Sequence, residues 1–224
     1  LSTSLNPVAL GIATAGVATL GTAEVAAFGL ITKIEAFALV PLLALSSASA
    51  PFVGQNSGAG KQERSRTALW WCCGIAFGWT LIVSILLLMT ASSFLLPAFS
   101  DDGQVIDLAS RYLLLVCWTF AGYGITVALS AAMNGLGRPF NALTIAGGRA
   151  MALVAPAAWL GAELAGFTGV AVGIATANAL AGVVGVIIIW RHSLNVRDEK
   201  HAQRHGKEAD EVSGRGDKLS EAAG

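Results

Sequence analysis

Long apolar stretches alternate with short polar breaks along most of this chain. A helix needs about 20 mostly apolar residues to cross the hydrocarbon core of a membrane, and six stretches meet that requirement. Because the breaks between them are short, we expect neighbours in sequence to lie antiparallel in space. The pattern predicts an all-α membrane protein with a bundle of six transmembrane helices. The predicted spans cover about residues 2–20, 25–51, 68–97, 109–133, 140–164 and 167–190.

The break after the second span differs from the apolar runs around it. Residues 54–66 begin among glycines and collect Lys61, Arg64 and Arg66 against a single acidic side chain. Lysine and arginine mark the cytoplasmic side of a membrane protein. We therefore predict a cytoplasmic loop here, with its basic cluster against the anionic leaflet. The loop at 134–139 is predicted to lie on the same side.

Composition supports a membrane-embedded body with a separate polar tail. The chain is 54% hydrophobic and only 12% charged, whereas a soluble domain carries about a quarter charged residues. Half of the charged side chains lie within residues 191–224. We predict a transmembrane bundle over 1–191 and a charged cytoplasmic tail over 192–224, disordered or forming a frayed helix. Since the chain begins at Leu1 inside an apolar run, we expect that an N-terminal part of a longer protein precedes it.

Three segments resemble a known family of transporters. The run AAFGLITKIEAFALVPLLALSSASAPFVGQNSGAG, residues 26–60, looks like the eighth helix and following loop of the multidrug and toxic compound extrusion (MATE) transporters. The run SAAMNGLGRP, residues 130–139, resembles the loop after their tenth helix, and GVAVGIATANALAGVVGVIIIW, residues 169–190, resembles their last helix. Within the family the resemblance is strongest to the branch named for a DNA-damage-inducible membrane protein.

This resemblance implies an architecture and a function. MATE transporters have twelve helices in two six-helix bundles that face each other across a central cleft, so the chain is expected to be the C-terminal bundle and to need an N-terminal one as its partner. The implied function is an antiporter of the bacterial inner membrane that exports amphipathic organic cations or drugs in exchange for protons. The alternative is a lipid or oligosaccharide flippase of the same wider superfamily. A flippase should line its cleft with several basic residues, and only Lys33 and Arg149 are available.

Three ionisable residues lie inside the predicted spans: Lys33, Glu35 and Arg149. An ionisable group at this depth costs at least a few kcal/mol and is a candidate functional residue by default. From the rise of a helix, Glu35 and Arg149 each lie about 15 Å from the start of their spans, near the midplane. One hypothesis is a structural ion pair between Glu35 and Arg149, and the other is a proton or cation site at Glu35. We favour the pair, because an adjacent arginine keeps a carboxylate ionised.

The resemblance also bears on the coupling ion. Sodium-coupled members of the family place acidic residues in their seventh and tenth helices. Residues 1–20 contain no acidic side chain, and neither does the run LLLVCWTFAGYGITVALSAAMN that corresponds to the tenth helix. We therefore expect protons rather than sodium, with the titrating acid in the N-terminal bundle.

Two further residues are candidates for conformational or ligand roles. Pro41 lies inside its span, where it removes a backbone hydrogen bond and favours a kink. Two interpretations of this stretch are open: the kink forms a hinge, or the small residues that follow Pro41 simply allow close helix packing. Trp70 and Trp71 lie at the predicted inner boundary, as an aromatic belt would. Trp118 lies deeper, where it either packs or stacks on a substrate.

Enzymatic chemistry is not expected. The run GQNSGAGK lacks the spacing of a P-loop and follows no strand. No nucleophile–base arrangement and no cluster of metal ligands occurs among the spans. We therefore predict a non-enzymatic protein without a cofactor or metal, whose partners are a small amphipathic substrate and membrane lipid rather than nucleic acid.

Overall fold

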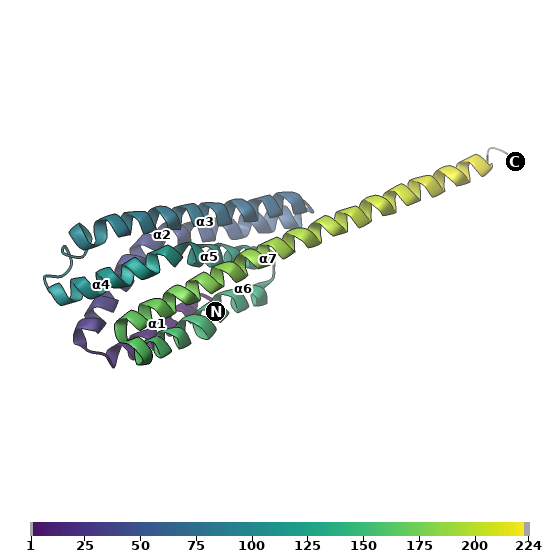
Figure 1. The fold of residues 1–224 in the computed structure, drawn as a ribbon. Coiled ribbons are helices and arrows are strands. Elements are labelled where there is room, and N and C mark those ends of the chain that lie inside the picture. The colour runs from purple at the N-terminus through teal and green to yellow at the C-terminus, as the bar shows by residue number, and fades with distance from the viewer. Residues whose placement is uncertain (1, 222–224) are drawn as a thin grey trace. The chain divides into compact units, whose positions relative to one another are not determined.

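The computed structural model describes the backbone of residues 2–221 and the side chains of residues 5–191. Within this part the chain is helical, with short connecting turns and no strand, which confirms the predicted all-α class (Figure 1). The chain forms two units, residues 1–186 and residues 187–224. The first unit is the helical bundle. In the second, the backbone is helical to Glu221, and the side chains of the predicted tail, 192–224, lie outside the described residues.

Several of the long helices contain a short irregular segment. The elements in chain order are α1 (Ser2–Ala18), α2 (Thr22–Gly58), α3 (Gln62–Thr90), the π-helical η1 (Ala91–Leu95), α4 (Gly103–Val116), the 3₁₀-helical η2 (Cys117–Thr119), α5 (Phe120–Gly135), α6 (Pro139–Gly147), the π-helical η3 (Gly148–Val154) and α7 (Ala155–Glu221).

Four helical stretches among the described residues are long and apolar enough to cross a membrane, fewer than the six predicted spans. The difference has two causes. The last stretch, Pro139–Arg191, is 53 residues long and contains a break at Ala165 and Gly166, where the backbone leaves helical geometry. The first predicted span forms only the 17-residue α1, about 25 Å long. Each predicted span therefore coincides with a helical segment, although two of them are joined and one is short.

The predicted loop at 54–66 is wrong in extent, because most of it is helical. Helix α2 continues to Gly58, and the chain turns only at residues 59–61. Gly60 has a φ of 72°, and the backbone N–H of Lys61 donates to the carbonyl of Asn56 at 2.9 Å. This left-handed glycine ends the helix while satisfying its last carbonyls. The polar residues at the end of α2 stay helical. A change in hydropathy therefore marks the end of the predicted span and not the end of the helix.

Helix α5 lies in the middle of the bundle, in contact with α2, α3 and α6 (Figure 1). Its glycines allow these contacts to be close. A Cβ atom at Gly124 would lie 2.8 Å from Cγ2 of Thr80 in α3, and one at Gly135 would lie 2.9 Å from Cα of Ala50 in α2. Lipid provides no hydrophobic force between helices, so close packing of small residues has to hold them together.

The last helix also packs against α5 through small residues. A Cβ atom at Gly122 of α5 would collide with the carbonyl oxygen of Asn178 and would lie 3.3 Å from Cα of Gly182, both in α7. The two segments of α7 on either side of its break meet in the same way, with Gly161 against Gly169. Glycine at these crossings therefore sets the distance between the helix axes.

Four side chains of α3 and α5 donate hydrogen bonds to backbone carbonyls of neighbouring helices. In a membrane every backbone polar group has to be satisfied within the protein, so such bonds supplement the helical ladder where helices meet or change geometry. The donors and acceptors are Ser65 to Val53 at 3.3 Å, Trp79 to Ala38 at 3.1 Å, Ser84 to Cys117 at 2.7 Å and Ser130 to Ala142 at 3.1 Å.

A topology test follows from the arrangement of α3. Its helix and η1 together span 34 residues, about 51 Å, and separate Arg64 from Asp102. In a background without Cys72, Cys73 and Cys117, we expect Arg64→Cys and Asp102→Cys to react with a membrane-impermeant thiol reagent from opposite sides, Asp102→Cys from outside. Labelling of both from one side would contradict the predicted topology.

A second test concerns the crossing of α5 with α7. We expect Gly122→Ala to lower the folded yield of the complete protein, because the added methyl group collides with the backbone of α7. Gly29→Ala is the matched control, since no atom lies within 4 Å of a Cβ at Gly29 and alanine favours a helix by about 0.5–1 kcal/mol over glycine. The measurement is the monodisperse fraction after detergent extraction. Equal yields for the two variants would refute the packing argument.

Candidate functional site

A polar cluster lies among the apolar helices of the bundle. It is formed by Asn6 of α1, Tyr123 of α5, Arg149 of η3 and Asn178 of α7, and we call these four residues the polar cluster. Four separate elements therefore converge on one guanidinium group. Polar and ionisable groups at this depth are rare and mark substrate or ion pathways in membrane proteins, so the polar cluster is the candidate functional site.

Arg149 makes a set of contacts with neutral groups. Its Nη2 donates to Oδ1 of Asn178 at 3.0 Å, and its Nη1 donates to Oδ1 of Asn6 at 3.2 Å. The Cζ atom lies 4.0 Å from the centroid of the Tyr123 ring, a cation–π contact. Asn6 Nδ2 in turn donates to the hydroxyl of Tyr123 at 3.2 Å. The positive charge is thus held by two amide oxygens and a ring, and no carboxylate of the described residues forms an ion pair with it.

The polar cluster runs from the interior of the bundle to its surface. Asn178 is only 2% exposed, Arg149 and Tyr123 are half-buried, and Asn6 is exposed. One end is therefore fixed by packing, because Asn178 lies at the close crossing of α5 with α7. The other end is accessible from outside the bundle, where a ligand or another part of a larger protein can reach it.

The position of Arg149 follows from the irregular geometry of its helix. It is the second residue of η3, a π-helical segment between α6 and α7. A π-turn holds an extra residue, changes the direction of the side chains that follow, and occurs often at functional sites. The backbone irregularity and the buried charge therefore coincide at the same point of the chain.

Glu35 of α2 lies near the polar cluster but outside it. Glu35 and Arg149 form no ion pair with each other in the described part of the chain. The predicted direct pair is therefore wrong, because Asn6, Asn178 and Tyr123 occupy the guanidinium instead. Oε1 of Glu35 and Nε of Arg149 are both buried without a hydrogen-bond partner among the described residues.

The other predicted site residues are distributed around the bundle. Lys33 and Pro41 are exposed positions of α2, which runs without interruption through the proline. Trp118 lies in η2 and is 74% exposed. Within the described residues, no hydrogen bond, ion pair or ring contact joins any of the three to the polar cluster. The hinge role of Pro41 and the substrate role of Trp118 stay predictions.

Sequence reasoning identified Arg149 but not its partners. Asn6, Tyr123 and Asn178 are polar residues inside apolar helices, which is the signal that would have included them. An uncharged amide or phenol in a membrane span still has to find a hydrogen-bond partner. Because these residues lie far apart in the sequence, their common destination became visible only with the packing of the helices.

A bundle of membrane-length helices with a polar site among its spans is the architecture of a membrane transporter. The family model described as MatE matches residues 3–160, more than half of the chain, so the chain belongs to the MATE family. The family resemblance inferred from the sequence is thereby confirmed. Its members include transporters of known structure, as the following comparisons show.

The chain is similar to proteins from several bacteria. It is 32% identical over 182 residues to the FAD transporter of Shewanella oneidensis, covering 80% of this chain and 39% of that protein. It is 31% identical over 187 residues to the protein named "Probable multidrug resistance protein NorM" of Deinococcus radiodurans, covering 83% and 41%. The chain thus spans about two fifths of the length of these curated relatives.

A solved structure shows the same fold. The Vibrio cholerae MATE transporter VcmN in its bent form aligns with a TM-score of 0.79 and 29% sequence identity, over 85% of this chain and 43% of that one. The all-α membrane class, an integral membrane location and membership of a transporter family are therefore shown.

A stability test addresses the polar cluster. We expect Asn178→Ala to destabilise the complete protein by about 1.5–3 kcal/mol, because it leaves a buried guanidinium N–H without an acceptor. Tyr123→Phe is the matched control: it keeps the cation–π contact and removes only the hydroxyl at the accessible edge, so its loss should stay below about 1 kcal/mol. Denaturant unfolding in mixed micelles measures both. A neutral Asn178→Ala would contradict the structural role assigned to this bond.

Proposed function

We propose that the complete protein is a proton-driven secondary exporter of small amphipathic organic molecules, and that this bundle is the C-terminal one of its two halves. The polar cluster is the observation that carries the proposal, because it places a charge and hydrogen-bonding groups at membrane depth with one accessible edge. Family membership supports export, as does the multidrug resistance name of a relative. Alternating access requires a second bundle to move against the first.

The proposed location follows from the same reasoning. We propose the bacterial inner membrane as the location, which is supported by the bacterial origin of the relatives. The basic segment 54–66 and the charged tail 192–224 are assigned to the cytoplasmic side by their lysines and arginines. The second bundle is assigned to sequence before Leu1.

Organic cations are the first substrate class, and an anionic dinucleotide such as FAD is the second. The second class is favoured by a specific observation. Among the described residues, the charged side chains inside the predicted spans are Lys33, Glu35 and Arg149. Of these, Arg149 belongs to the polar cluster and gives it a positive charge. A guanidinium suits phosphate groups, which it can bind through two parallel hydrogen bonds. A relative named as a FAD transporter supports the same class.

Glu35 is proposed as the proton-carrying group of this bundle. Helices α1 and α5 contain no acidic residue, and sodium-coupled relatives would be expected to have acids in the corresponding positions, which supports protons over sodium. Glu35 and Arg149 form no ion pair with each other within the described residues, so no direct cationic partner holds Glu35 in its ionised form. A carboxylate without a tight partner is free to bind and release a proton during transport.

The transport test uses vesicles that contain the complete protein. With an imposed proton gradient, we expect extrusion of a cationic dye such as ethidium, which stops when the gradient is collapsed. Glu35→Gln should abolish the gradient-driven transport while the protein still folds, because glutamine cannot carry the proton. Lys33→Gln is the matched control, an exposed charge two residues away on the same helix, and should keep its transport.

Other outcomes distinguish the alternatives. Export of FAD without export of the dye would assign the second substrate class. Movement of neither compound, or of lipid-linked sugars alone, would contradict the proposed function. Unchanged proton-driven transport in Glu35→Gln would place the coupling acid in the other half.

A further inference from the structure

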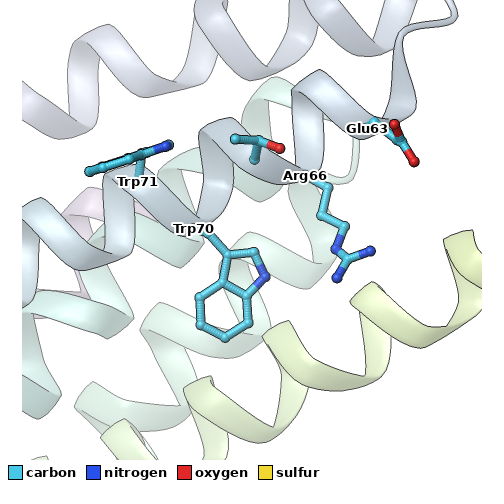
Figure 2. Close-up of a pocket in the computed structure, with 5 residues that line it drawn as sticks. Glu63, Arg66, Trp70 and Trp71 are labelled. Carbon is cyan, nitrogen blue, oxygen red and sulfur yellow. The ribbon is translucent and has the colours of Figure 1, made fainter.

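A shallow pocket of about 320 Å³ lies on the surface of α3 near the start of the helix. We call it the α3 pocket. It is separate from the polar cluster, because none of the four cluster residues lines it. Figure 2 shows the side chains of Arg66 and Trp70 extending to the same side of the helix. The residues that line the pocket are Glu63, Arg66, Thr67, Trp70 and Trp71.

The charged part of the α3 pocket is Arg66. Its side chain is half-buried, and it forms no hydrogen bond or ion pair within the described residues. Glu63, on the preceding turn, has an interaction of its own. Lys61 and Arg64 precede Arg66 in the sequence and do not line the pocket. A guanidinium with open donors is suited to bind a phosphate group.

The aromatic part of the α3 pocket lies one turn further along. The side chains of Trp70 and Trp71 are 44% and 69% exposed. Tryptophan concentrates at the headgroup level of a bilayer, where its ring lies between polar and apolar surroundings. The pocket therefore combines the guanidinium group of Arg66 with two tryptophan rings on the next turn of the helix.

The surface of α3 beyond the α3 pocket is continuously apolar. The exposed side chains along this side are Phe77, Leu81 and Ile85, and a Cβ at Gly74 would meet no atom within 4 Å, so the surface is recessed just beyond the tryptophans. A ligand that fills the pocket and continues along this surface needs a charged head and a long apolar part. A phospholipid has both.

We propose that the α3 pocket is a binding site for an anionic phospholipid. Arg66 holds the headgroup phosphate, the two tryptophans hold the glycerol level, and an acyl chain follows the recess at Gly74. Anionic lipid is preferred over zwitterionic lipid because the guanidinium group of Arg66 would repel the positive group of a choline headgroup. The proposal does not depend on the transported substrate.

The test uses the complete protein in detergent micelles, titrated with phosphatidylglycerol or phosphatidylcholine, with bound lipid counted by native mass spectrometry. We expect preferential retention of phosphatidylglycerol. Arg66→Gln should weaken that retention roughly tenfold, because a charge-assisted hydrogen bond is lost. Arg66→Lys, which keeps the charge but loses the paired donors, should give an intermediate loss.

The matched control is Arg64→Gln, which removes the same charge two residues away, outside the lining of the α3 pocket. It should change retention less than about twofold, since an exposed charge is strongly screened. Equal losses in Arg66→Gln and Arg64→Gln would overturn the proposal in favour of diffuse attraction. So would equal binding of the two lipids, or a changed oligomeric state of Arg66→Gln with unchanged retention, which would assign the pocket to a protein contact.

Discussion

Close approach of helix backbones is the constraint on which the rest of this structure depends. In lipid the apolar side chains gain nothing by leaving their surroundings for one another, so helices associate through packing and hydrogen bonds. Helix α5 meets three neighbours at three glycines, Gly122, Gly124 and Gly135. Each contact leaves no room for a side chain, and together they make α5 the centre of the bundle.

The same packing assembles the polar cluster. The crossing at Gly122 brings the backbone of Asn178 against α5, which places the amide of Asn178 on the level of Tyr123. Arg149 then reaches both from η3. A guanidinium with neutral partners only is less completely compensated than one in an ion pair. The charge of the Arg149 guanidinium group therefore stays available to a ligand at the accessible edge of the polar cluster.

The bundle presents two chemically different surfaces. On one, the polar cluster offers a charge at membrane depth among α1, α5, η3 and α7. On the other, α3 exposes apolar side chains over most of its length and changes to basic and aromatic residues only near its start. The two surfaces therefore differ in the groups they offer to a ligand: hydrogen-bonding groups and a charge on the first, and mainly apolar side chains on the second.

Hydropathy alone determined the class of the protein, because the cost of placing polar groups in hydrocarbon acts on each segment separately. Each predicted span coincides with a helical segment. The resemblance of three segments identified the family, which the family comparison confirmed. Helix ends were predicted too early at 54–66, since a helix continues into the headgroup region without any apolar signal. The partners of Arg149 were decided only by the tertiary structure. Asn6 and Asn178 are 172 residues apart in the sequence. The glycine crossings set the rotation and separation of the helices, and this packing decides which polar groups reach the guanidinium group of Arg149.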